Sequence, residues 1–135
     1  MSTPHTVQRA LTCGIAAVWL INGLLCKILG LVPRHELIVA RILGGDHAHF
    51  FTTAIGAAEV GMAIWVLSGI APRTNAALQV AVIATMNILE FILAPDLLLW
   101  GRLNAVFALA FMALISWHAL RERPGGADPG PRRAT

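Results

Sequence analysis

The sequence predicts an all-α integral membrane protein, a bundle of four transmembrane helices with both termini in the cytoplasm. Three observations support this fold class. Of the 135 residues, 57% are hydrophobic and only 13% are charged, whereas an ordinary soluble domain is about 25% charged. The mean hydropathy is +0.72. Four apolar stretches each approach or exceed the roughly 20 residues that a spanning helix needs. They are apolar on all sides, which argues against a soluble bundle with a charged outer face.

The predicted membrane domain covers residues 10–120, with spans at 10–32, 50–71, 76–94 and 97–120. Pro33, Pro72 and Pro95 follow the first three stretches, and charged residues follow the fourth. The first stretch lacks a small-residue cleavage site, so we interpret it as a permanent span rather than a signal peptide. Residues 1–9 are expected to form a short cytoplasmic segment. Residues 121–135 are rich in Pro, Gly and Arg and cannot bury a core, which predicts a disordered cytoplasmic tail.

The distribution of cations predicts the orientation. With four spans, the side of the termini holds six cations and the other side holds four; the six are Arg9, Arg73, Arg121, Arg123, Arg132 and Arg133. Cytoplasmic loops carry the excess of Lys and Arg, so this side is predicted to be the cytoplasm. Trp100 and Trp117 are expected to mark the two interfaces, since 17 residues of helix separate them by about 25 Å.

The longest loop, residues 33–49, falls on the outer side. It contains a short amphipathic segment, with an apolar face made by Leu37, Ile38, Ile42 and Leu43. Such a segment is expected to lie on the membrane surface or to cap the bundle.

Ionisable residues within the spans fall at a common depth. Counted from the outer ends at about 1.5 Å per residue, Lys27, Glu59, Glu90 and Arg102 lie roughly 6 to 13 Å deep. Two are positive and two are negative, and the inner half of the sequence shows no comparable set. In the third span Gln79, Asn87 and Glu90 share one helix face, which is therefore expected to face the bundle interior.

These residues have a structural and a functional interpretation. Buried pairs and amide hydrogen bonds hold transmembrane helices together, yet ionisable residues inside a membrane often mark functional sites. We take Glu90 with Arg102 as the first choice of ion pair, because their predicted depths are similar. Small residues beside Glu59, such as Gly56 and Gly61, permit close helix approach. The candidate ligand-binding site or buried polar cluster comprises Lys27, Glu59, Asn87, Glu90, Arg102 and Asn104.

Other chemistries find little support. Asp46, His47 and His49 lie in the outer loop without a recognised metal-ligand spacing, so neither a metal nor haem is predicted. Cys13 and Cys26 would lie about 20 Å apart on one helix, too far for a disulfide. The cations are scattered rather than striped, which argues against nucleic acid as a partner.

Three runs of sequence carry a family resemblance: WLINGLLCKILGLVPRH, IGAAEVGMAIWVLSG and NILEFILAPDLLLWGRLNA, within residues 11–117. In these runs the chain resembles the DoxX-like family of small bacterial membrane proteins. The resemblance implies a multi-pass protein of the bacterial cytoplasmic membrane, in a superfamily named after a subunit of a thiosulfate:quinone oxidoreductase. It implies a redox enzyme as a candidate partner and a quinone as a candidate cofactor, but no catalytic residues.

Three functions therefore compete. The first is an accessory membrane subunit of a redox system that binds a quinone or another small amphipathic molecule in the outer half of the bundle. The second is a structural or assembly protein whose charges only hold helices together. The third is a small-solute transporter, disfavoured because the inner half lacks a polar path and the spans are not visibly broken. A standalone enzyme is not favoured, and a homo-oligomer is left open.

Overall fold

The computed structural model describes residues 3–122, and every regular element in this range is helical. Four helices are long and apolar enough to cross a membrane: His5–Ile28, Ala48–Ser68, Pro72–Leu93 and Gly101–Arg121. Large apolar side chains remain exposed on their outer faces, including Ile64, Leu78, Ile88 and Leu109, as lipid-facing helices require. The predicted all-α fold with four transmembrane helices is confirmed.

The elements follow one another along the chain as helices joined by short connections. The first span combines α1 (Thr3–Leu20) with a π-helical continuation, η1 (Ile21–Ile28). A short helix, α2 (Arg34–Leu43), leads to α3 (Ala48–Ser68) and α4 (Pro72–Leu93). Two single turns, η2 (Pro95–Leu97) and η3 (Gly101–Leu103), precede α5 (Asn104–Arg121).

Two predicted boundaries were wrong. Helix α1 begins at Thr3, so most of the predicted N-terminal segment 1–9 is helical. The fourth span was predicted to begin at Leu97, but the spanning helix begins at Gly101, where the turn η3 leads into α5. Gly101 adopts a left-handed φ of 56°, which interrupts a run that is apolar enough to read as one helix. Most of the predicted tail, residues 121–135, lies outside the described residues, which end at Glu122.

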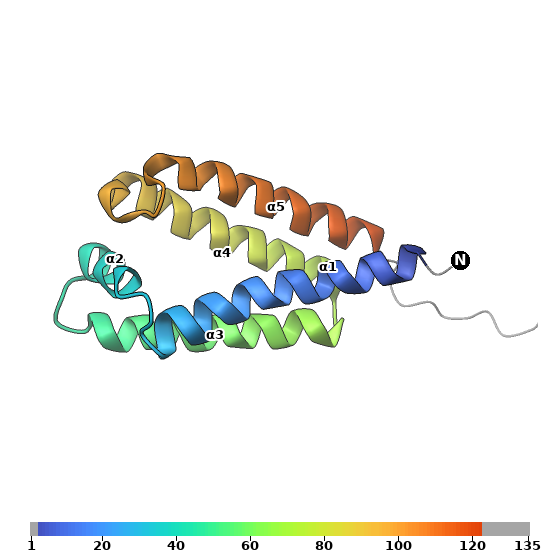
Figure 1. Cartoon of the computed structure of the whole chain (residues 1–135), viewed down its shortest axis with the longest axis horizontal. Helices are drawn as coiled ribbons and strands as arrows, with labels where there is room; N and C mark the ends of the chain where they lie inside the picture. The colour runs from blue at the N-terminus through green and yellow to red at the C-terminus, as the bar shows by residue number, and fades with distance from the viewer. Residues whose placement is uncertain (1–2, 123–135) are drawn as a thin grey trace, which may run out of the picture.

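The four spans form two pairs that diverge. One pair is α1 and η1 against α3, and the other is α4 against α5, while contacts between the pairs are few. Figure 1 shows the pairs close together near the N-terminus of α1 and spread apart toward α2. We call the close end, with the α3–α4 turn, the inner end, and the end with α2 the outer end.

The buried core lies where the pairs converge. Helix α1 contributes Ile15 and Trp19, and α5 contributes Ile115, which is 1% exposed. The full cluster of buried residues is Ile15, Ala16, Trp19, Met62, Ala63, Val66, Ala76, Ile83, Ile115 and Ala119. Because this core joins both pairs at the inner end, the outer end can spread.

Helix α2 closes the outer end, where it packs against both α3 and α4. Its buried residues are Ile38 and Val39, whereas Leu37 and Leu43 stay more than half exposed. Of the predicted apolar face, Ile38 packs into the bundle, while Leu37 and Leu43 remain available to contact lipid. Of the two predicted positions for this segment, the cap on the bundle is the one observed.

Candidate functional site

A buried ion pair joins the first span to α3. The Lys27 ammonium lies 2.8 Å from each oxygen of the Glu59 carboxylate and donates to both. Each residue is 5% exposed. Lys27 thus turns inward instead of extending toward headgroups, because Glu59 supplies a charged acceptor within reach.

Two glycines allow the helices to approach closely beside this pair. A Cβ added at Gly23 would lie 2.5 Å from the carbonyl oxygen of Gly56, and one at Gly56 would lie 2.7 Å from that of Gly23. Lys27 follows Gly23 by four residues within the π-helical segment η1, so both face α3 and both are buried. Gly56 was predicted as a contact residue. Its partner Gly23 was missed, because a glycine in an apolar run carries no signal of what it faces.

A cavity of about 550 Å³ opens between the two helix pairs beside the ion pair. Its volume lies within the range of small-molecule sites. Polar side chains of five elements reach it, and aromatic rings from the first span, the α4–α5 loop and α5 line its walls. The lining residues are Val18, Trp19, Asn22, Lys27, His35, Glu59, Ile83, Met86, Asn87, Glu90, Trp100, Asn104, Phe107, Ala108 and Phe111.

Five of the six predicted site residues line this cavity: Lys27, Glu59, Asn87, Glu90 and Asn104. The Asn104 side-chain amide donates to the Asn87 side-chain oxygen at 3.1 Å and so joins α5 to α4. Asn87 in turn donates to the Ile83 carbonyl at 2.8 Å. The polar face predicted for the third span does point into the bundle.

Arg102 does not join the other five residues. Its guanidinium lies 5.2 Å from the centre of the Phe91 ring, and its side chain is exposed. Within residues 3–122 Glu90 makes no ion pair, so the predicted pairing of Glu90 with Arg102 was wrong. The depth argument failed because the fourth span begins at Gly101 rather than at Leu97, so Arg102 lies in its first turn, η3, at the outer end of the helix.

The outer end of the cavity is covered by α2. Arg41 donates to both carboxylate oxygens of Asp96 in the α4–α5 loop, at 2.9 and 3.2 Å. This hydrogen bonding lowers the pKa of Asp96. His35 of α2 lines the cavity, and burial, with the charges of Lys27 and Arg34, lowers its pKa to about 4. Its imidazole is therefore neutral at pH 7.

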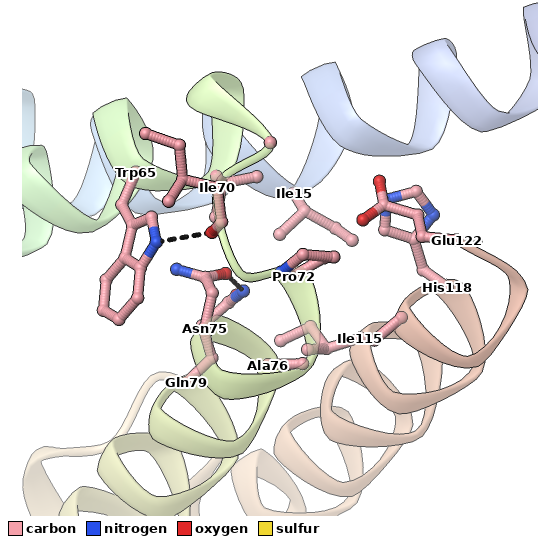
Figure 2. A pocket seen from close by; sticks show the side chains of 13 residues that line it. Ile15, Trp65, Ile70, Pro72, Asn75, Ala76, Gln79, Ile115, His118 and Glu122 are labelled. Atoms are coloured by element: carbon pink, nitrogen blue, oxygen red, sulfur yellow. Dashed lines mark hydrogen bonds and ion pairs between the residues drawn. The ribbon is translucent and has the colours of Figure 1, made fainter. Parts of the chain in front are cut away.

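A second set of buried polar residues lies near the inner end. Trp19 donates through Nε1 to Gln79 at 2.7 Å, and Gln79 donates to Asn75 at 2.5 Å. On the other side of a small pocket of about 20 Å³, His118 lies beside Glu122. Figure 2 shows the Asn75–Gln79 pair and His118 flanking this pocket. The sequence prediction concerned a set of ionisable residues, whereas these inner residues are mostly uncharged.

Apart from Gln79, the residues of this inner set were not predicted from the sequence, because they are uncharged or lie near helix ends. Thr12 Oγ1 lies 3.0 Å from His118 Nε2 and also donates to the Gln8 carbonyl. Thr12 therefore accepts a hydrogen bond from Nε2–H. This leaves the buried Nδ1 of His118 without a partner among the described residues.

Cys13 and Cys26 are both free.

Comparison with known protein families shows to which family this chain belongs. A sequence profile of the DoxX-like family matches residues 16–116. The chain belongs to the DoxX-like family. No curated protein and no solved structure matches it significantly.

The matched region of this DoxX-like protein contains every residue that lines the large cavity, from Val18 to Phe111. In the part of the chain that the structure describes, no three His, Cys, Asp or Glu residues are placed to hold a metal ion. The polar cavity between the helix pairs is therefore the candidate site of this DoxX-like membrane protein.

Proposed function

We propose that this DoxX-like protein binds a small amphipathic molecule in the cavity between its two helix pairs. The observation that carries the proposal is the mixed apolar and polar lining of this cavity. Trp19, Phe107 and Phe111 offer apolar surface, while Glu90 and Asn104 offer polar groups in the same cavity of about 550 Å³. Apolar walls with a few convergent polar groups are typical of small-molecule sites.

The molecule is expected to enter from the bilayer. Helices α1 and α5 touch near the inner end, where Gln8 donates to the His118 carbonyl. Farther out, Val18 and Phe107 line the cavity and are 39% and 54% exposed. The water-facing route is covered by α2 and its contact with the α4–α5 loop. A membrane-dissolved ligand therefore has the shorter route, between α1 and α5.

In its narrower form, the proposal makes the chain an accessory membrane subunit of a redox system, with a quinone as the ligand. A quinone ring suits the aromatic walls, because aromatic rings stack on one another. Its carbonyl oxygens need hydrogen-bond donors, and neutral His35 and the Asn104 amide are candidates. Glu90, however, presents a carboxyl group with no side-chain partner in residues 3–122. A quinone oxygen and the carboxylate form of Glu90 both only accept hydrogen bonds, so that form offers a quinone no hydrogen bond.

The structural alternative is supported by the ion pair itself, since both carboxylate oxygens of Glu59 bind Lys27. This pair holds η1 against α3. The Glu90 carboxyl group, by contrast, has no ion-pair partner in residues 3–122, which favours binding over a purely structural role.

Binding can be tested by blocking the cavity. Ala108 lines it, so Ala108→Phe should fill part of the space, while exposed Ala110→Phe on the same helix is the matched control. Protein purified in native lipid should release a co-purifying small molecule detectable by mass spectrometry. The Ala108→Phe variant should lose it and the Ala110→Phe variant should keep it. Equal retention by both folded variants would contradict the proposal.

The quinone form has its own test. Trp100 lines the cavity and Trp65 does not. A short-chain quinone titrated into the reconstituted protein should quench Trp fluorescence, and Trp100→Phe should remove more of that quenching than Trp65→Phe. Equal quenching in both variants would show contact with the lipid-facing surface instead.

A further inference from the structure

Some ionisable groups around the large cavity have a partner of opposite charge, and others do not. Lys27 is committed to Glu59, whose two oxygens both lie 2.8 Å from its ammonium. These two charges cancel within one close contact. His35 is neutral at pH 7, since its pKa is lowered to about 4. Of the ionisable groups that line the cavity, Glu90 is left without a partner in the described chain.

The Glu90 carboxyl group is accessible from the cavity. Its side chain is half-buried, and its oxygens are not among the enclosed polar atoms that lack a hydrogen-bond partner in the described residues. A cation inside the cavity can therefore reach the Glu90 carboxyl group directly.

The walls supply a second, independent preference for a cation. Trp100 and Phe107 lie with their ring centres 4.5 Å apart, and both line the cavity along with Trp19 and Phe111. Aromatic faces attract ammonium groups, and several rings around one cavity are the usual arrangement for recognising them. The same rings also accept an apolar chain.

We infer that the cavity selects amphipathic amines, with an ammonium head group held by Glu90 and the aromatic walls and an apolar chain directed toward the bilayer. This inference rests on the proposed function, a cavity that binds an amphipathic molecule, and narrows the chemistry of the head group. The inference also explains why a quinone fits poorly: an ammonium group can donate hydrogen bonds to the Glu90 carboxylate, whereas a quinone carbonyl only accepts them.

The experiment compares three probes with the same chain: dodecylammonium, dodecanol and dodecanoate. Binding is measured by Trp fluorescence in nanodiscs of phosphatidylcholine, with empty nanodiscs correcting for partition into lipid. Wild-type protein should prefer dodecylammonium to dodecanol by about tenfold to a hundredfold, the range expected for a charge-assisted hydrogen bond. Dodecanoate should bind more weakly than dodecanol.

Glu90→Gln should abolish the preference for the amine over dodecanol, and a circular dichroism spectrum equal to that of the wild type should show that the variant is folded. Glu36→Gln is the matched control, because Glu36 lies on α2 at the same end of the bundle and does not line the cavity. It should keep the full preference. Persistence of the preference in Glu90→Gln, or its absence in the wild type, would overturn the inference.

The two proposals can fail separately. If all three probes bind alike and Ala108→Phe blocks them, the cavity binds amphipathic molecules without selecting amines. If Ala108→Phe changes the binding of no probe, the proposed function fails, and the inference fails with it.

Discussion

The ion pair between Lys27 and Glu59 should contribute strongly to stability only while both charges are present. Both residues are 5% exposed, so removing one partner leaves a charge in a medium that solvates it poorly. Loss of one member of such a buried pair costs about 3–5 kcal/mol. We therefore expect Lys27→Met to lower the free energy of unfolding by about that amount.

The two single variants should differ. In Lys27→Met the Glu59 carboxylate stays in the middle of α3, remote from headgroups. In Glu59→Leu the freed ammonium lies in the last turn of the first span, which ends at Ile28, and its long side chain can extend toward water. Glu59→Leu should therefore cost less than Lys27→Met.

The double variant decides whether the pair acts as a unit. Replacing a buried ion pair with apolar residues is often neutral or stabilising, so Lys27→Met with Glu59→Leu should recover most of the loss. The coupling free energy should reach at least about 3 kcal/mol. Equilibrium unfolding in mixed micelles, followed by circular dichroism, measures all four proteins.

An exposed ion pair provides the control. Arg41 and Asp96 also form two hydrogen bonds, but their side chains are 45% and 61% exposed. Solvent screens such a pair, and its coupling should be far smaller. Additive effects of the Lys27 and Glu59 substitutions would refute the reasoning, since independent residues show no coupling.

Three further predictions follow from the same geometry. Gly56→Ala should lower the free energy of unfolding by about 1–3 kcal/mol, because the added Cβ would lie 2.7 Å from the facing carbonyl oxygen. Gly61→Ala on the same helix is the control: its Cβ would meet none of the described atoms within 4 Å, so the free energy of unfolding should be unchanged or raised. In a cysteine-free background, Asp46→Cys should react with an impermeant maleimide in intact cells and Arg73→Cys should not; the reverse pattern would invert the predicted topology. His35 has its folded-state pKa lowered from 6.5 to about 4, so the stability it contributes is complete above pH 6.5 and is lost as the pH falls toward 4. His35→Gln should flatten that part of the stability profile, and an unchanged profile would show that His35 is not buried as described.

The resemblance to the DoxX-like family, the four spans and most of the site residues could be predicted from sequence. Glu59 and Glu90 stand out because a carboxylate in an apolar helix is costly and needs a reason. Gln79, Asn87 and Glu90 share a helix face by spacing alone. The pairing could not be predicted, because residues at similar depth on four helices can combine in several ways. Lys27 and Glu59 are joined by the contact between Gly23 and Gly56, which depends on how two helices rotate against each other.

The sequence by itself determined that this chain is a four-span membrane protein, because in lipid each span must be long, apolar and internally hydrogen-bonded. It also determined which residues are too polar to face lipid. Only the tertiary structure decided that Glu59 is paired, that Glu90 faces an open cavity, and that Arg102 lies outside it. The reason is that burial and charge pairing depend on helix rotation and divergence. Both are set by contacts between residues far apart in the chain.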